Sequence, residues 1–265
     1  MKILNPKASF DGRYLLNIGC GGRFHIEWNN IDFKPAHPHI IKLDIKKGLP
    51  YETKSFDAVY SSHLMEHLNA EAARNLLSES SRVLKPNGIL RLVMPDLEYN
   101  AKLYLESLNR VKLDKSPLNR EHYEWAVLNL IDQFVREKSG GAMKKFLLRQ
   151  DLQDDDFIVS TTGGGEVQIV RDTGKIPGQQ NSLLRICRGL KNRFISRNFQ
   201  KSGEKHNWAY DSYSAGKLLQ DSGFSDVQIL DPYSSSIPKF NSFNLDVDIN
   251  GIVYKPNSLF VECRK

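Results

Sequence analysis

The chain has 265 residues, which is enough for one large α/β domain or two small ones. Its 40% hydrophobic and 26% charged residues are ordinary for a folded protein, and the net charge of +6 is modest. No apolar run has the roughly 20 residues that cross a bilayer, no signal peptide is evident, and three unpaired cysteines exclude a disulfide framework, so we expect a cytoplasmic protein.

Short apolar runs in the first hundred residues alternate with helix or turn signals. Five of them are expected to be strands, at residues 13–18, 29–33, 39–45, 56–61 and 89–94. Before the last one, residues 70–84 carry a helical stripe that Asn69 caps and Pro86-Asn87-Gly88 stops. Buried runs that alternate with helices predict a doubly wound α/β fold with a parallel sheet.

The middle of the chain has a different pattern. Ser116-Pro117 is typical of a helix start, and the apolar stripe that follows runs to Gly140-Gly141. Residues 150–182 are polar and contain three consecutive glycines, so they predict a mobile loop. Residues 185–205 carry seven basic residues against one acid and are expected to be helical. Such a run suits phosphate groups, although a solvated helix face is the favoured explanation.

The last sixty residues return to the sheet pattern. A helix, a strand, a turn and a final strand are expected in that order, at residues 211–223, 226–230, 250–251 and 258–263. Residues 98–205 are therefore predicted to be a mostly helical lid, inserted after the fifth strand of a single domain that spans residues 1–265.

Candidate ligand groups follow four consecutive strands. Gly19-Cys20-Gly21-Gly22 follows the first, Asp32 ends the second, Asp44 ends the third, and Ser61-Ser62-His63 follows the fourth. In open parallel sheets ligands bind at the carboxyl ends of the strands. Glycines allow close approach of the backbone, and a carboxylate after the second strand can accept both hydroxyls of a ribose. Asp44 is placed to accept from the exocyclic amine of an adenine.

The sequence argues against two common nucleotide sites. Phe24 stands where a dinucleotide fingerprint needs a small residue, and residues 22–29 are too few for a full crossover helix whose N-terminus could hold a pyrophosphate. No G-x-x-x-x-G-K-[ST] sequence occurs, which argues against a P-loop. A phosphate-free adenosyl ligand fits better, and S-adenosylmethionine (SAM) is such a ligand.

His63-Leu64-Met65-Glu66-His67 matches the H-x-x-E-H pattern of inverted zinc peptidases. That metal site needs both histidines and the glutamate on one regular helix. The pentapeptide instead follows directly on an expected strand, and the helix signal begins only near Asn69. We therefore expect no metal here. His63 is expected to border the reaction pocket, and Glu66 and His67 to brace the loop.

Several motifs together resemble the class I SAM-dependent methyltransferases. They are LLNIGCGG, WNNIDF, LDI, SFDAVYSSHLMEHL, VLKPNGILRLVMPDLE and, in the tail, HNWAYDSYSAGKLLQDSGF with KPNSLFVECRK. The resemblance is greatest to the branch found with bacterial cell-surface polysaccharide biosynthesis, and covers about residues 1–100 and 205–265. It implies a Rossmann-like sheet of seven strands whose last strand is antiparallel.

The resemblance also implies roles for individual residues in SAM binding. Gly19, Cys20 and Gly21 would hold the methionine end, Asp32 the ribose, and Asp44 with Ile45 the adenine; Ser61, Ser62 and His63 would line the pocket near the methyl group. Two positions depart from the family pattern. Asn17 stands where many relatives have an acid, and Arg23 replaces the third glycine.

Methyl transfer to a hydroxyl gains from a general base, and the ordinary pKa of histidine suits that task. His63 and His206 are the candidates, and Asp96 could orient such a base. His206 stands where the insertion returns to the sheet, and a purely structural role would explain it equally well.

The resemblance favours a small-molecule or glycan acceptor. The basic residues 185–205 would suit a phosphate on that acceptor or an anionic membrane surface. Neither an [DNS]-P-P-[YF] motif after the fourth strand nor a Pro-Cys nucleophile occurs, which argues against a nucleic-acid acceptor. Two alternatives stay open, a nucleic-acid methyltransferase that uses the basic segment and a non-catalytic scaffold module in a glycan-assembly complex. The sequence leaves the oligomeric state open.

Overall fold

The computed structural model describes residues 3–173 and 205–265. The chain forms two compact units, and each is described by itself below. Unit 1 comprises Met1–Asp96, Ala209–Val253 and Ser258–Lys265, and unit 2 comprises Leu97–Trp208 and Tyr254–Asn257. Among the helices that the structure describes, none has the length and apolarity to span a bilayer.

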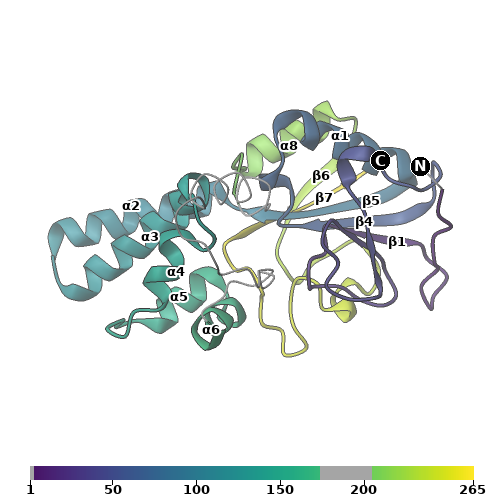
Figure 1. Cartoon of the computed structure of the whole chain (residues 1–265). Helices are drawn as coiled ribbons and strands as arrows, with labels where there is room; N and C mark the ends of the chain where they lie inside the picture. The colour runs from purple at the N-terminus through teal and green to yellow at the C-terminus, as the bar shows by residue number, and fades with distance from the viewer. Residues whose placement is uncertain (1–2, 174–204) are drawn as a thin grey trace, which may run out of the picture. The chain divides into compact units, whose positions relative to one another are not determined.

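Unit 1 is built on a seven-stranded sheet in the order β3-β2-β1-β4-β5-β7-β6. Figure 1 labels β1, β4, β5, β7 and β6 of this sheet. The strands are β1 Leu15–Ile18, β2 Asn29–Asp32, β3 Ile40–Lys42, β4 Phe56–Ser62, β5 Leu84–Pro95, β6 Ser225–Leu230 and β7 Ser258–Arg264. β7 runs antiparallel to β5 and β6, whereas the other neighbouring strands are parallel. The predicted doubly wound α/β fold is confirmed, including its antiparallel last strand.

Both faces of the sheet are buried, as expected for a mainly parallel sheet. Alternate residues of each strand point to opposite faces, so Leu16 and Val59 belong to one core cluster while Leu15 and Tyr60 belong to another. The helices α1 Ala70–Val83 and α8 Ser212–Asp221 pack on the first face. Trp28 and the 3-10 helix η3 Phe240–Phe243 pack on the second.

Side-chain caps begin the helices of unit 1 where the sequence predicts them. The Asn69 side chain accepts from the amide of Ala72 at 2.8 Å, and Asp211 forms a capping box with Ser214. The prediction that Pro86-Asn87-Gly88 stops helix α1 is wrong, because the helix ends at Val83 and these residues lie within β5. They occupy an irregular part of the ladder, where the register with β4 shifts.

Unit 2 is helical in the part that the structure describes. Its helices are α2 Leu97–Leu113, α3 Pro117–Val135, α4 Gly141–Leu147, α5 Asp155–Thr162 and α6 Gly164–Thr173. Ser116 caps α3 and Pro117 occupies its first turn, as predicted. The stripe predicted to reach Gly140 ends at Val135, and Gly140, with a φ of 82°, precedes α4.

The predicted mobile loop over residues 150–182 is wrong where the structure describes it. Asp154 caps α5, and Gly163, with a φ of 97°, separates α5 from α6. Ile158, Val167 and Val170 are buried with Trp125 in the core of unit 2, so a few apolar residues suffice to anchor two polar helices. Residues 174–182, and residues 185–204 of the basic segment, lie outside the described residues.

Candidate active site

The turn after β1 is shaped by two glycines with positive φ, Gly19 at 68° and Gly21 at 55°. The amides of Gly19 and Cys20 donate to the carbonyl of Ile31 at 2.9 and 3.3 Å, which holds the turn against β2. A Cβ atom on Gly21 would have no heavy atom within 4 Å. The turn therefore presents open backbone at the carboxyl end of β1, where a ligand can approach closely.

Asp32, the last residue of β2, is directed at this turn. Its Oδ2 accepts from the amide of Gly21 at 2.8 Å, and its Oδ1 accepts from the amide of Lys34 at 2.7 Å. An ionised carboxylate has about four acceptor positions, so each oxygen can accept a further hydrogen bond. Asp32 is only partly buried, and the vicinal hydroxyls of a ribose fit its remaining capacity.

A backbone hydrogen bond brings the chain just before Asp44 and Ile45 next to Asp32. The amide of Leu43 donates to the carbonyl of Asp32 at 2.9 Å. The strand predicted to reach Ile45 is shorter, because β3 ends at Lys42. Asp44 instead caps the 3-10 helix η1 Ile45–Lys47, where its Oδ1 accepts from the amide of Lys46 at 3.1 Å.

The two serines at the end of β4 differ in their surroundings. Ser61 is buried, and its hydroxyl donates to the carbonyl of Ile18 at 2.9 Å, so its side chain ties β4 to β1. Ser62 is the last residue of β4 and is partly exposed. Of the two, Ser62 has the more accessible side chain for a ligand.

The pentapeptide His63 to His67 does not form one regular α-helix. His63 has a φ of 51°, and its amide donates to the carbonyl of Val93 at 2.8 Å. The 3-10 helix η2 Met65–His67 follows directly. This geometry separates the first histidine from the helical turn, so the arrangement that an inverted zinc peptidase needs is not formed.

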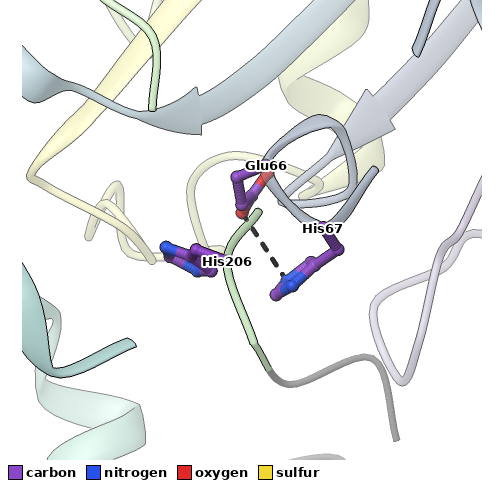
Figure 2. A group of neighbouring side chains, drawn as sticks. All are labelled: Glu66, His67 and His206. Atoms are coloured by element: carbon purple, nitrogen blue, oxygen red, sulfur yellow. Dashed lines mark ion pairs between the residues drawn. The ribbon is translucent and has the colours of Figure 1, made fainter. Parts of the chain in front are cut away.

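Glu66 is 1% exposed and lies between two imidazoles of unit 1. Its Oε1 is 3.2 Å from Nδ1 of His63 and 3.8 Å from Nε2 of His67, and the second contact is the dashed line in Figure 2. His206, also labelled in Figure 2, belongs to unit 2 and is described there. The negative charge of Glu66 also contributes, after burial, to a raised pKa of Tyr210.

The two other predicted catalytic residues, Asp96 and His206, lie at or near the end of a chain segment of their units. Asp96 follows β5 directly and pairs with Tyr210 in an isolated parallel β-bridge. His206 is 6% exposed within unit 2, where its amide donates to the carbonyl of Gln133 at 3.0 Å. Its ring contacts Phe134 edge-on, with centroids 5.4 Å apart.

Several contacts of the site were not predicted. Ser258, at the start of β7, has its hydroxyl 2.9 Å from Nε2 of His63. Leu64 packs closely on the glycine turn. A Cβ atom added to Gly19 would lie only 2.8 Å from Leu64 Cδ2. The antiparallel β7 pairs Ser258 with Pro95, which places Ser258 at the carboxyl end of β5. The contact between Ser258 and His63 could have been expected only from the antiparallel pairing of β7 with β5.

The two departures from the family pattern meet within the site. Asn17 is fully buried in β1, and its Nδ2 is 3.2 Å both from the carbonyl of Arg23 and from Oδ1 of Asn30. A buried amide at this position therefore links the glycine loop to β2 without placing a charge there.

Cys20 is an unsuitable nucleophile despite its place in the turn. Burial, and secondarily the charge of Asp32, raise the pKa of its thiol to about 12. The thiolate is the reactive form of cysteine, so this side chain is inert near neutral pH.

Residues 16–92 match the methyltransferase domain family. They contain the glycine turn, Asp32 and His63, and they fold into the parallel half of the sheet described above. Residues 16–92 therefore carry a methyltransferase domain, and the protein is a SAM-dependent methyltransferase. No curated protein matches the sequence of this methyltransferase.

Two solved structures illustrate what the methyltransferase is similar to. A SAM-dependent methyltransferase from Archaeoglobus fulgidus is 15% identical with a TM-score of 0.39, over 96% of this chain and 86% of that one. One from Mesorhizobium loti is 15% identical with a TM-score of 0.38, over 98% and 93% of the two chains. These values are too low to bear on the substrate, and the assignment rests on the family match and the strand order.

Proposed function

We propose that the methyltransferase methylates a hydroxyl group of a small-molecule or glycan acceptor in cell-surface polysaccharide synthesis. The observation that carries the SAM site is the hydrogen bond from the Gly21 amide to Asp32. It supports a cradle in which open backbone and a carboxylate with free acceptor capacity lie side by side. A scaffold that has lost its cofactor would have no need of this arrangement.

Each predicted residue has a proposed part in holding SAM. The turn of Gly19, Cys20 and Gly21 would bind the methionine end, and Asp32 the ribose hydroxyls. Asp44 and Ile45 would border the adenine. Ser61, Ser62 and His63 would lie near the methyl group, Ser61 through its backbone because its side chain is engaged with Ile18.

When bound, SAM supplies a methyl group activated by its sulfonium charge. The chain's residues must align the acceptor and remove its proton, and alignment alone can supply much of the rate. His63 is the proposed general base, since its ring lies at the carboxyl end of β4 and its side chain is 20% exposed. His206 is kept as a second candidate base, and Asp96 as a residue that orients one.

The acceptor side of the proposal draws on unit 2 and on the resemblance of the sequence to the polysaccharide branch. We propose that residues 98–205 form a lid inserted in a single domain, that basic residues 185–205 meet a phosphate on the acceptor or an anionic membrane surface, and that the protein acts in the cytoplasm.

Calorimetry with SAM and with S-adenosylhomocysteine tests the cofactor site. Wild-type protein should bind both, and Asp32→Ala should bind SAM about 10- to 100-fold more weakly, because hydrogen bonds to a charged group contribute about 1.5–3 kcal/mol. Asp248→Ala is a matched control. Asp248 also accepts from two backbone amides of unit 1, those of Asn250 and Ile252, both at 2.8 Å. Undiminished affinity in Asp32→Ala would refute the site, and absence of binding in wild type would favour the scaffold.

Incubation with labelled SAM and a panel of sugar nucleotides, cell-envelope extracts and RNA tests the acceptor. Label in a glycan or sugar nucleotide supports the proposal, whereas label only in RNA supports the nucleic-acid alternative. With the acceptor in hand, His63→Ala should lower kcat by about 10²–10⁴, the usual contribution of a general base, while SAM affinity holds. Unchanged kcat in both His63→Ala and His206→Ala would remove the general-base step.

A further inference from the structure

Three side chains of unit 1 form a line through His63. Nδ1 of the imidazole is 3.2 Å from Glu66 Oε1, and Nε2 is 2.9 Å from the Ser258 hydroxyl. Glu66 belongs to η2, His63 to the turn after β4, and Ser258 to the start of β7, so Glu66 and Ser258 are far apart in the sequence. One ring nitrogen therefore faces a carboxylate oxygen at ion-pair distance, and the other is hydrogen-bonded to a hydroxyl.

We infer that Glu66 is a positioning residue that fixes the tautomer of His63, so that the hydrogen lies on Nδ1 and the lone pair on Nε2. This inference deepens the proposed function, since it rests on His63 being the base. An ionised carboxylate has no hydrogen of its own, so a neutral imidazole whose Nδ1 faces it at 3.2 Å is favoured when that nitrogen carries the ring hydrogen. The neutral ring then accepts at Nε2, and the Ser258 hydroxyl donates to it.

The backbone at His63 supports a functional demand on this ring. Its φ of 51° lies in the left-handed region, which costs a non-glycine residue about 1 kcal/mol or more. The hydrogen bond that the His63 amide donates to the Val93 carbonyl holds that conformation. This backbone conformation places the imidazole between the Glu66 carboxylate and the Ser258 hydroxyl. The protein keeps it despite the strain of the positive φ.

The burial of Glu66 supports the same inference. A carboxylate that is 1% exposed is costly to bury unless polar partners compensate for the lost water. The two imidazoles, from His63 and His67, face its Oε1. Bracing of the loop alone would not require a carboxylate, because an apolar side chain of similar size could fill the space.

The inferred tautomer defines the path of the proton in the proposed reaction. The acceptor hydroxyl takes the place of the Ser258 hydroxyl at Nε2, at the 2.6–3.2 Å typical of a general base. With SAM bound, that oxygen would receive the methyl group while the sulfur leaves as the thioether of S-adenosylhomocysteine, and its proton would pass to Nε2. The hydrogen on Nδ1 stays on the ring, and the Glu66 carboxylate stabilises the imidazolium that forms.

Long-range ¹H–¹⁵N NMR of ¹⁵N-histidine-labelled protein, without cofactor or acceptor, tests the inference directly. At a pH where the ring is neutral, His63 should show the Nδ1–H tautomer. His122 of unit 2 is an internal reference for the opposite tautomer. Its Nε2 is 2.9 Å from Asp154 Oδ2, so it should show the Nε2–H tautomer. The substitutions His63→Gln and His122→Gln assign the two rings by deleting their signals.

Glu66→Gln retains the shape of the side chain but can donate as well as accept. We expect the His63 signals to change to a mixture of tautomers or to Nε2–H, while Glu71→Gln, an exposed acid in the first turn of α1, leaves them unchanged. The Nε2–H tautomer in wild type would overturn the inference, whether or not Glu66→Gln folds. Nδ1–H in wild type with full turnover by His63→Gln would instead leave the tautomer established and refute the proposed base.

Discussion

Arg91 and Asp246 form an ion pair that is almost fully enclosed in unit 1. Nε of Arg91 donates to Oδ2 of Asp246 at 2.8 Å, and their side chains are 0% and 1% exposed. The guanidinium also donates to Glu262 at 2.9 Å, and the Tyr60 hydroxyl donates to Asp246. This network joins β4, β5 and β7 to the loop that carries Asp246, so it holds that loop on the sheet.

Arg91→Met should therefore lower the free energy of unfolding by about 3–5 kcal/mol, the usual cost of removing one partner of a buried ion pair. The substitution leaves two buried carboxylates without their cation. Urea denaturation followed by circular dichroism measures the change. Lys217→Met is the control, because its pair with Asp221 on α8 is about 60% exposed on both sides and should contribute nothing measurable. Equal effects of the two substitutions would contradict the role given to the network.

Gly19→Ala should disturb both stability and cofactor binding. A residue other than glycine at a φ of 68° costs about 1–2 kcal/mol, and the new Cβ atom would also displace Leu64. We expect the free energy of unfolding to fall by that amount and calorimetry to show weaker SAM binding. Gly216→Ala, within α8, has an ordinary φ and nothing closer than Val227 at 4.0 Å, so it should be neutral or stabilising.

Gly163→Ala tests the packing of unit 2. The φ of 97° is almost restricted to glycine, and an added Cβ atom would lie 2.0 Å from the carbonyl oxygen of Tyr254. Backbone strain alone costs about 1–3 kcal/mol, and a backbone atom cannot move aside as a side chain can. The melting temperature should fall clearly. Gly165→Ala, with nothing within 4 Å, should not lower it, and a tolerated Gly163→Ala would show that this contact is not formed.

Two buried thiols should make the stability of the protein depend on pH in the alkaline range. Burial raises the pKa of both Cys20 and Cys263 to about 12, well above the ordinary value near 8.5. Folding thus favours the protonated thiols, so their contribution to stability is complete below pH 8.5 and is lost as pH rises towards 12. Native protein at pH 8 should leave both residues unmodified by iodoacetamide, as peptide mass spectrometry can check, whereas unfolded protein should react at both. Modification of Cys20 without unfolding would contradict its burial.

The parts of the fold that local signals specify were predictable. Asn69, Ser116 and Asp211 begin their helices because a side-chain acceptor next to an apolar stripe is a signal within a few residues. The proximity of Asp32 to the glycine turn could be expected from parallel strands, whose carboxyl ends meet at one edge.

The failures have a common physical cause in contacts between distant residues. Helices α5 and α6 are polar and depend on Trp125 of α3 to bury their few apolar residues, so their own sequence resembles a loop. The bond between His63 and Ser258 depends on β7 pairing with β5, which no short stretch of sequence indicates. Tertiary packing decided both.

The bridge between Asp96 and Tyr210 brings together the two points where the chain leaves unit 1 after β5 and returns before α8. A segment whose ends are neighbours can be lengthened, shortened or exchanged without altering the sheet, which is where natural insertions are best tolerated. Evolution could therefore vary the residues between Asp96 and Tyr210 and leave the glycine turn and Asp32 of unit 1 unaltered.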